Sequence, residues 1–384
     1  MNTPEQITAE KFSFTSSVAA DVWHAKPNAE AYEWWYFDAL SEDGRDAVVI
    51  IFLDNFIFSP QYNRSVQSSK FKVQNLKSRV QSPESRVGEI QNPKSKIRNF
   101  PAVAFTYYRD GKPKYRAINE FAVEGFSADA EKPFCRIGEN FFRFESAPYG
   151  SGYVLSIDAK LRRNCRLKAN FEWLSIEKDF LPEKPIYTED AHSWNLVVAR
   201  ADVTGKISVS ETKGRNTDVV NFRGTGYHDH NFDNRWLPET VSDWQWGRAH
   251  FADATAVFYR YKEINEKEPT TKIFIVQDDI LSEKAVIYKG ENFARDVFSL
   301  RYAKKLSFAA ADDTRLKVKQ TRIIDSSFFY LRFLSEMTLT LPDGKPRKTV
   351  GITEYLQPKA LKYRWLDWLV NMRIGRNGKG SFLP

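Results

Sequence analysis

The chain has 384 residues and a net charge of +8, and 42% of its residues are hydrophobic and 15% are aromatic. A chain of this length is sufficient for two domains with wide apolar walls. Most of the charge lies in residues 64–99, with nine Lys or Arg against two Glu, and in residues 359–384, with six against one Asp, so the rest of the chain is nearly neutral and no nucleic-acid partner is predicted.

The two cysteines, Cys135 and Cys165, are too few for a disulfide framework and lack the spacing of a metal-binding pair. No window of the sequence is long and apolar enough for a membrane-spanning helix, and the first residues lack the apolar core of a secretory signal. We therefore expect a reducing compartment and predict a cytoplasmic location.

Most of the chain alternates β-branched and aromatic residues with turn residues every dozen or so positions, which is typical of antiparallel strands. The nearly continuous apolar run at residues 46–58 predicts a central strand covered on both faces. Hairpins are predicted at residues 141–160, 194–209 and 333–355. Many antiparallel strands with short connections predict an all-β fold of barrels or sandwiches, which can enclose a ligand.

Residues 64–99 repeat a short theme rich in Ser, Lys, Gln and Asn, with isolated apolar residues and two prolines. Such a segment cannot bury enough apolar surface to fold alone, so it is predicted to be a disordered, low-complexity basic insertion in a loop. The alternative is a basic arm that contacts acidic lipid or nucleic acid.

Residues 359–374 place Leu361, Trp365, Trp368 or Leu369, and Met372 at helical spacing, with basic residues elsewhere around the wheel. This pattern predicts a terminal amphipathic helix. It would cap a barrel or, because of its two tryptophans and its positive charge, lie on a membrane surface.

The segment EWWYFDA concentrates polar groups among aromatic residues near the start of the chain. Alternate residues of a strand share a face, so Glu33 is predicted to point to the same side as Trp35, and Asp38 to the opposite side. A carboxyl group surrounded by aromatic rings has a raised pKa and can act as a general acid near neutral pH. The alternative is that the two carboxylates pair with an arginine or cap a turn.

The segment GTGYHDHNFD, which starts at Gly224, holds the densest group of titratable side chains. His228 and His230 are predicted on one face of a strand and Asp229 on the other, which suits an acid and base in one pocket, two metal ligands or structural histidines. A metal needs a third and usually a fourth ligand, and no second ligand cluster is present, so no metal is predicted. Gly224 and Gly226 indicate a bulge or a close backbone approach.

Motifs for nucleotide binding and serine hydrolysis are absent from the sequence. It contains no Walker sequence, no G-x-G-x-x-G between a strand and a helix, and no G-x-S-x-G elbow. The motifs therefore predict neither a nucleotide-dependent enzyme nor a serine hydrolase.

Taken in order, several segments resemble the carotenoid 1,2-hydratase (hydroxyneurosporene synthase) family and its AttH-like, lipocalin-like relatives. They are YEWWYFDA near residue 32, HSWN at residue 192, GYHDHNF at residue 226, W-x-W-G-R-A at residue 244 and GITEYL at residue 351. The order of these segments carries the resemblance, which covers about residues 20–360.

The resemblance implies two consecutive lipocalin-like (calycin) β-barrel or sandwich domains with a short C-terminal helix, and chemistry without a cofactor in an apolar cavity. We predict an N-terminal domain at residues 15–232, which contains the insertion at 64–99, and a C-terminal domain at 233–360. A basic amphipathic tail is predicted at residues 361–384.

In the hydratases, water adds across a terminal double bond of an acyclic carotenoid: an acid protonates one carbon, and water captures the tertiary carbocation with the help of a base. The resemblance implies catalytic roles for His230 and Tyr259, and Asp229 and Glu33 are the candidates for the proton donor. Aromatic walls suit this reaction because π faces stabilise positive charge. The predicted substrate-binding residues are Trp35, Phe232, Trp244, Trp246, Tyr261 and His192.

Two positions depart from the family pattern. Phe232 stands where the hydratases have a tryptophan, and no acid closely follows Tyr259, since the first carboxylate on that strand face is Glu263. The leading hypothesis is a cofactor-independent hydro-lyase that acts on a carotenoid or similar isoprenoid. The alternatives are a lipocalin-like carrier of a lipid or pigment and a cyclase or isomerase that uses the same cavity.

An enzyme of this kind should place His230 and a carboxylate within hydrogen-bond distance in the cavity, whereas a carrier can have apolar walls. Peripheral membrane contact through the basic tail is a separate hypothesis.

Overall fold

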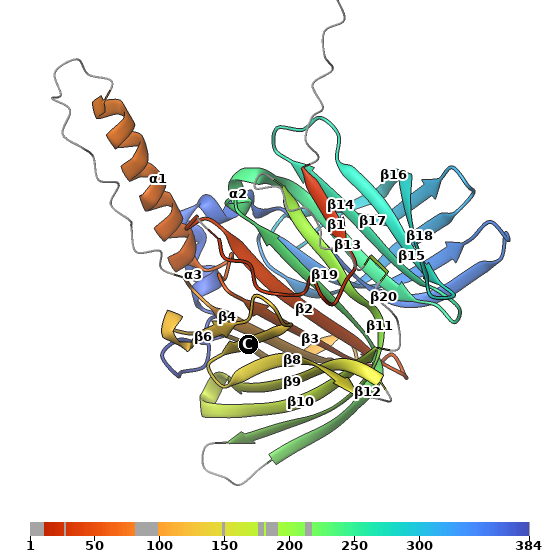
Figure 1. The fold of residues 1–384 in the computed structure, drawn as a ribbon, viewed down its shortest axis with the longest axis horizontal. Coiled ribbons are helices and arrows are strands. Elements are labelled where there is room, and N and C mark those ends of the chain that lie inside the picture. The colour runs from red at the N-terminus through yellow and green to blue at the C-terminus, as the bar shows by residue number, and fades with distance from the viewer. Residues whose placement is uncertain are drawn as a thin grey trace, which may run out of the picture.

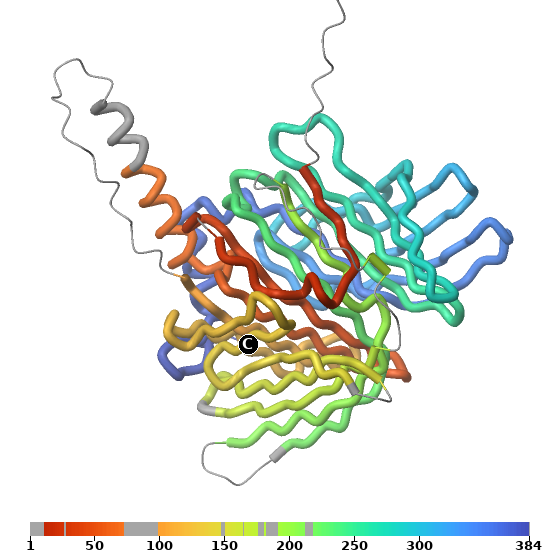
Figure 2. The backbone as a smooth tube through the Cα atoms, viewed as in Figure 1, coloured from red at the N-terminus to blue at the C-terminus, as the bar shows by residue number. Residues whose placement is uncertain are grey.

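The computed structural model describes residues 11–26, 28–80, 99–147, 150–175, 180–181, 191–211 and 217–383. The strands in these residues form two sheets, a curled 12-stranded sheet from the first half of the chain and a closed barrel from the second half (Figure 1). The backbone trace shows the sheet, red to green, beside the barrel, green to blue (Figure 2). The predicted all-β, lipocalin-like fold is confirmed.

The first sheet has the strand order β5-β4-β3-β2-β12-β11-β10-β9-β8-β7-β6, and β1 pairs in parallel with β11. Its strands are β1 Phe12–Thr15, β2 Tyr32–Ser41, β3 Asp46–Leu53, β4 Ala102–Arg109, β5 Lys112–Glu120, β6 Phe126–Ala128, β7 Phe134–Ile137, β8 Asn140–Ala147, β9 Gly150–Lys160, β10 Cys165–Ser175, β11 His192–Glu211 and β12 Thr217–Asp233. The sheet curls so that Asn119 of β5 meets Lys160 of β9: the Lys160 amide N–H donates to the Asn119 side chain at 2.9 Å.

The barrel joins antiparallel neighbours in chain order and closes where β13 pairs with β20. Its strands are β13 Val241–His250, β14 Thr255–Glu263, β15 Thr270–Gln277, β16 Ile280–Arg295, β17 Arg301–Ala310, β18 Arg315–Ser326, β19 Tyr330–Thr340 and β20 Pro346–Leu356. A short helix, α2 (Leu237–Thr240), lies between the two sheets in the chain. The domain boundaries predicted at residues 15–232 and 233–360 stay a prediction.

β2 and β12 are neighbours near the middle of the first sheet, and their two faces line different interiors. Trp35 and Phe37 belong to the core enclosed by the curled sheet, where Phe37 stacks on His228 with ring centroids 3.8 Å apart. Trp34 and Tyr36 belong to the core shared with the barrel. The predicted alternation of faces along EWWYFDA is confirmed.

The glycines of β12 allow close backbone approach, which is one of the two alternatives that the sequence left open. A Cβ atom at Gly224 would overlap the carbonyl oxygen of Leu40, and one at Gly226 would overlap the rings and methyl groups of Trp173 and Val203. The pairing of β12 with β2 is regular through both glycines, but the pairing of β12 with β11 shifts register between His228 and Gly226, so the other alternative, a bulge, is present there as well.

One prediction about an individual strand is wrong, and another is confirmed only in part. β11 runs without a turn through residues 194–209, because Gly205 gives room for the ring of Phe171 on β10 and forms no turn. The apolar run at residues 46–58 is a strand only as far as Leu53. The other two predicted hairpins are confirmed as β8–β9 and β19–β20.

The predicted disordered insertion is wrong over residues 64–80, which belong to the helix α1 (Pro60–Val80); residues 81–98 lie outside the described part of the chain. α1 extends away from the sheet (Figures 1 and 2). Its start has a recognisable signal, because the hydroxyl of Ser59 accepts a hydrogen bond from the amide N–H of Gln61, and proline follows at the first helical position.

The first turns of α1 are fixed to the body of the protein. Tyr62 and Val66, one turn apart, are both buried, and the Trp236 indole N–H donates to the side chain of Asn63 at 2.8 Å. Of these anchoring residues only Val66 lies within the predicted insertion, where the polar composition concealed it, whereas Tyr62 and Asn63 precede the insertion.

The predicted amphipathic helix at residues 359–374 is divided into 3₁₀ turns at Pro358–Lys362 and Arg364–Leu366 and the short helix α3 (Asp367–Asn371). Trp365 and Trp368 are 72% and 56% exposed, so the predicted apolar stripe is wrong in part. The buried hydrophobic side chains of the tail are Leu361, Leu366, Val370 and Ile374.

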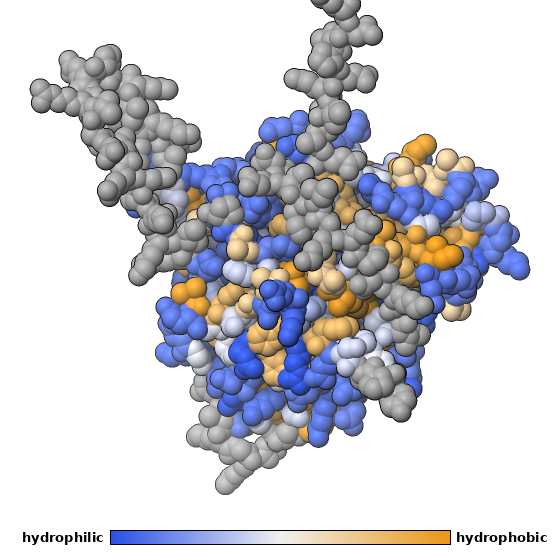
Figure 3. Space-filling view, viewed as in Figure 1, coloured by the Kyte–Doolittle hydropathy of each residue, from blue (hydrophilic) through white to orange (hydrophobic). Residues whose placement is uncertain are grey.

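The visible face of the molecule mixes hydrophilic side chains with hydrophobic groups, some of which lie on the barrel (Figure 3). Among the described residues, no helix is both long and apolar enough to cross a membrane.

Candidate active site

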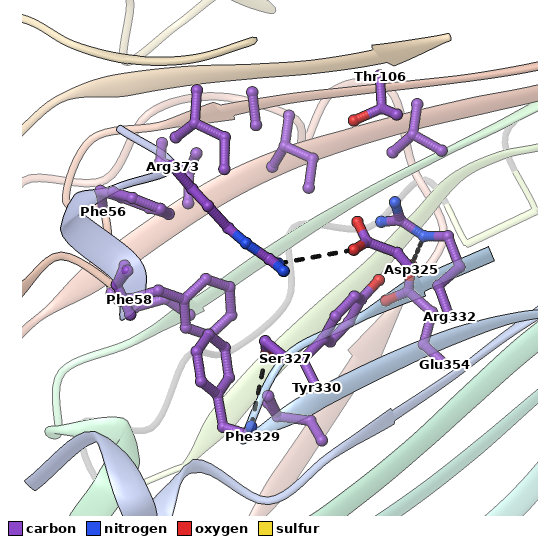
Figure 4. Close-up of a pocket in the computed structure, with 18 of the residues that line it drawn as sticks. Phe56, Phe58, Thr106, Asp325, Ser327, Phe329, Tyr330, Arg332, Glu354 and Arg373 are labelled. Atoms are coloured by element: carbon purple, nitrogen blue, oxygen red, sulfur yellow. Dashed lines mark hydrogen bonds and ion pairs between the residues drawn. The ribbon is translucent and has the colours of Figure 1, made fainter. Parts of the chain in front are cut away.

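A cavity of about 280 Å³ lies between the curled sheet and the barrel. β2, β3, β4, β5 and β12 supply one wall, β13, β18, β19 and β20 supply the other, and the C-terminal segment adds Leu369, Val370, Arg373 and Leu383. Aromatic side chains such as Phe56, Phe58 and Phe329 line one part of the cavity, and charged side chains gather in another (Figure 4).

Asp229 of β12 lines this cavity. Its Oδ2 accepts hydrogen bonds from the Tyr227 hydroxyl at 2.8 Å and the Trp194 indole N–H at 3.1 Å, and its Oδ1 accepts one from the Asn231 amide at 2.9 Å. Burial raises the pKa of Asp229 to about 8, so the carboxyl group is mostly protonated at neutral pH. All three partners donate, so none of these bonds uses the acidic proton.

Tyr259 of β14 is connected to Asp229 through Asn231. Its hydroxyl donates to Asn231 Oδ1 at 3.3 Å and shares a hydrogen bond of 2.7 Å with His192 Nε2. Burial lowers the pKa of His192 to about 3, so this ring is neutral, and it stacks on Tyr261 with ring centroids 4.9 Å apart. These residues form a continuous polar chain from β11 and β14 to the carboxyl group at the cavity.

His230 lies on the opposite face of β12, inside the curled sheet. Its Nε2 is 2.7 Å from Glu33 Oε1 and its Nδ1 is 3.1 Å from Asp21 Oδ1. Burial alone would lower the pKa of His230, but the two carboxylates outweigh burial and raise it to about 9. His228 Nε2 also contacts Asp21, at 3.0 Å, so both histidines of the motif meet one carboxylate.

Glu33 is ionised, and the prediction that aromatic walls raise its pKa is wrong. Burial would raise the pKa of Glu33, but the Lys26 ammonium group and hydrogen bonds from His230 and His24 lower it well below its usual value. The other carboxyl group of the motif, Asp38, does have a raised pKa because of burial, although it pairs with the Arg248 guanidinium.

His24, Glu33 and His230 bring three ligand atoms within 4.8 Å of one another, which is geometrically sufficient for a metal ion. The charges on and around these three side chains, however, do not suit a metal ion. Lys26 already places a positive charge on Glu33, and His230 carries a proton up to a pKa of about 9.

The structure divides the four predicted catalytic residues between two places. Asp229 lines the cavity, and Tyr259 is connected to it through Asn231. His230 and Glu33 instead lie inside the curled sheet, in the group with His24 described above, which we call the inner cluster. His230 therefore meets carboxylates at hydrogen-bond distance, as expected for an enzyme, but it is not among the described residues that line the cavity.

Of the predicted substrate-binding residues, Trp244 and Trp246 line the cavity. Trp35 stacks on His230 in the inner core, and Phe232 borders a separate pocket of about 10 Å³. Tyr261 and His192, which stack on each other, are not among the described residues that line the cavity.

A second group of polar residues lines the cavity and was missed by the sequence analysis. Glu354 Oε1 accepts hydrogen bonds from Arg332 Nε at 2.8 Å and from the Tyr36 hydroxyl at 3.1 Å. Arg116 pairs with Asp325 at 2.9 Å. Glu354 lies in the GITEYL segment, which could have indicated it, whereas nothing in the strand pattern distinguishes the other residues.

The chain is similar to known proteins over most of its length. A hydroxyneurosporene dehydrogenase of Chlorobaculum tepidum is 26% identical over 377 residues, covering 96% of this chain and 94% of that protein. Two solved structures share the fold at 12% identity: CghA with Sch210972, with a TM-score of 0.55 over 89% of this chain and 94% of CghA, and a putative AttH of Nitrosomonas europaea, with a TM-score of 0.54 over 88% and 94%.

The family model of the carotenoid hydratase CrtC matches residues 176–382, which is more than half of the chain. The matched residues include the cavity wall from β12, β13, β19 and β20 together with Tyr259. The sequence match and the shared fold agree, and the chain belongs to the CrtC carotenoid hydratase family.

Proposed function

We propose that the protein is a cofactor-independent hydro-lyase that adds water to a terminal double bond of an acyclic carotenoid or a similar isoprenoid. Membership of a hydratase family supports hydro-lyase activity. The observation that carries the proposal is Asp229, a carboxyl group with a pKa of about 8 in the wall of an aromatic-lined cavity. Such a group is a general acid at neutral pH.

In the proposed reaction, Asp229 transfers its proton to the less substituted carbon of the double bond. The π electrons form the new C–H bond, and a tertiary carbocation develops on the other carbon. Trp34, Trp244 and Trp246 line the cavity, and their ring faces stabilise this charge. The hydrogen bonds from Tyr227, Trp194 and Asn231 then stabilise the carboxylate that remains.

Water captures the carbocation through its oxygen and must lose a proton. We assign the acceptor role to Glu354, whose carboxylate lines the cavity and is held by Arg332 and Tyr36. Its negative charge also contributes to the raised pKa of Asp229, after burial. Return of one proton from Glu354 to Asp229 through solvent restores the starting state, so the net change is the addition of one water molecule.

The cavity volume of about 280 Å³ is at the low end of ordinary ligand sites. It suits one end of an acyclic isoprenoid better than the whole molecule. Phe298, Phe328 and Leu369 line the cavity and are partly exposed, so the remainder of the ligand would leave between them.

Incubation with acyclic carotenoids in detergent, followed by chromatography for a hydroxylated product, tests the activity. We expect Asp229→Asn to lower the rate by about 10²- to 10⁴-fold, the usual contribution of a general acid, with ligand binding retained. The amide of Asn231 can turn over to accommodate the new amide group. A wild-type protein that binds carotenoid and forms no product would instead be a carrier.

The inner cluster provides the matched comparison. His230→Gln removes the side chain to which the family resemblance assigns a catalytic role. It leaves the cavity wall unchanged, because His230 faces the interior of the curled sheet. A loss of activity as large as that of Asp229→Asn, with the fold intact, would contradict Asp229 as the principal acid and place the chemistry at the inner cluster.

We also propose that the rim of the cavity contacts an anionic membrane surface. Val297, Trp368 and Phe382 are exposed, and each is next in sequence to a residue that lines the cavity. The C-terminal segment around two of them is basic. Exposed aromatic side chains with positive charge are typical of interfacial contacts.

Vesicle flotation tests the membrane contact. The full chain should float with vesicles that contain phosphatidylglycerol more than with pure phosphatidylcholine, and substitution of Trp368 and Phe382 by serine should remove the difference. Phe293→Ser, at an exposed position on β16, is the control. Equal flotation of all three proteins would reject the rim as the contact surface.

A further inference from the structure

The cavity contains more positive charge and more unpaired donors than a plain hydrocarbon ligand requires. Arg116, Arg332 and Arg373 line it together with the carboxylates Asp325 and Glu354. Arg332 and Glu354 form a pair with no net charge. Asp325, in contrast, is the only carboxylate partner given for both other arginines among the described residues, at 2.9 Å from Arg116 and 3.9 Å from Arg373. This end of the cavity therefore has a surplus of one positive charge.

Arg373 reaches across the cavity from the C-terminal segment toward Asp325 (Figure 4). The one hydrogen bond that its guanidinium group makes among the described residues goes to the backbone carbonyl of Ser326 at 3.0 Å. A guanidinium group has five N–H donors, so most of the donors of Arg373 are available to a ligand. Burial lowers the pKa of Arg373, as expected for a cation with incomplete pairing.

Two further donors at this end have no partner among the described residues. They are the Nε of Arg116, whose side chain is only 9% exposed, and the hydroxyl of Tyr330. Both residues line the cavity, and Figure 4 shows the Tyr330 ring among the charged side chains. Buried donors without acceptors are costly, and an acceptor oxygen in the cavity would remove that cost.

We propose that Arg373, Arg116 and Tyr330 form a binding site for an acceptor oxygen group of the ligand, and that a carboxylate fits this site best. The surplus positive charge favours an anion over a hydroxyl group, and the planar guanidinium groups suit the two oxygens of a carboxylate. The ligand class is then an acyclic isoprenoid with an oxidised end, with its hydrocarbon part against the aromatic wall. This inference rests on the isoprenoid ligand proposed above and extends it.

Binding of three compounds with the same acyclic chain tests the site: farnesoic acid, farnesol and farnesene. Titration calorimetry at neutral pH in detergent should show farnesoate binding about ten- to a hundredfold more tightly than farnesene, with farnesol between them. Equal affinities of the acid and the hydrocarbon would overturn the proposal, and would mean that the polar end holds only water.

Arg373→Met retains an extended side chain without the charge. It should bring the affinity for farnesoate to within a few-fold of that for farnesene and leave farnesene binding unchanged. Tyr330→Phe, a milder change, should weaken farnesoate and farnesol by a few-fold each. Arg364→Met, at an exposed arginine of the same segment, is the matched control and should change nothing.

A uniform loss of affinity for all three compounds in Arg373→Met would show a packing role and reject the site. The result of this binding test can be distinguished from the result of the hydration test. A preference for farnesoate without hydration of any carotenoid would retain this site and reject the reaction, whereas hydration without such a preference would do the opposite.

Discussion

Removal of the Tyr227 hydroxyl should shift the pKa of Asp229 further upward while the acid stays in place. The Tyr227 hydroxyl is 2.8 Å from Asp229 Oδ2, and this hydrogen bond lowers the pKa of the carboxyl group, against the larger effect of burial, which raises it to about 8. Tyr227→Phe removes the donor and retains the ring in the core. The indole of Trp194 and the amide of Asn231 still hold the carboxyl group.

The magnitude follows from the strength of a hydrogen bond to a charged group, about 1.5–3 kcal/mol, and from about 1.4 kcal/mol per pKa unit. The Tyr227 hydroxyl also donates to the protonated carboxyl group, and such a neutral bond contributes about 0.5–1.5 kcal/mol. Only the difference between the two protonation states shifts the pKa, so the pKa of Asp229 should rise by about one unit in Tyr227→Phe. In the proposed mechanism the protonated form of Asp229 is the active acid, so the wild-type rate should fall about tenfold per pH unit above the pKa. The variant should keep its activity about one pH unit further into the alkaline range.

The pKa can be measured without turnover, from the infrared carbonyl band of the protonated carboxyl group in difference spectra against Asp229→Asn. Rate profiles on an acyclic carotenoid then show whether the same pKa controls activity. Tyr62→Phe is the control, because the hydroxyl of Tyr62 donates to the backbone carbonyl of Glu30, away from this network. If the pKa that controls the rate profile is unchanged or lowered in Tyr227→Phe, and the fold is normal, the proposed role of Asp229 as the acid is refuted.

Two predictions concern stability. Arg248→Met leaves the buried carboxylate of Asp38 without its cation, so the free energy of unfolding in urea should fall by about 3–5 kcal/mol. The double variant with Asp38→Leu should recover most of this loss. An unchanged free energy of unfolding in Arg248→Met would contradict the prediction. His230 has a pKa of about 9 in the folded protein against about 6.5 when unfolded, so its stabilisation is complete below about pH 6.5 and is lost as the pH rises through about 9. His230→Gln should therefore flatten the pH dependence of urea unfolding between these limits, and an unchanged slope would show that the histidine is not the group responsible.

The sequence was sufficient to predict which side chains share a face of a strand, but not what packs against each face. Period-2 alternation depends only on the strand itself, so the opposite orientations of Asp229 and His230 follow from their adjacency. Which of them lines a cavity depends on how the barrel packs against the curled sheet, and no local pattern contains that contact. The helix α1 shows the same limit, because it is anchored by tertiary contacts of a few residues, among them Tyr62, Asn63 and Val66.

The ionisation of Glu33 could not be predicted from its aromatic neighbours for a related reason. Its pKa is decided by Lys26, His24 and His230, which come from a preceding loop and from a strand about 200 residues away. Burial among aromatic walls raises the pKa of a carboxyl group only where the cations and donors packed against it do not outweigh burial, as at Asp38 beside Arg248. Asp229 meets this condition, since its partners are a phenol, an indole and an amide, and all are uncharged donors.

The absence of an acid after Tyr259 then has a structural interpretation. The position two residues later on the same strand face holds Tyr261, which is buried and whose ring stacks on His192. A carboxyl group reaches Tyr259 from the neighbouring sheet instead, because Asn231 accepts from the tyrosine hydroxyl and donates to Asp229. The departure from the family pattern is therefore compatible with a proton donor, provided that the donor belongs to β12 and not to β14.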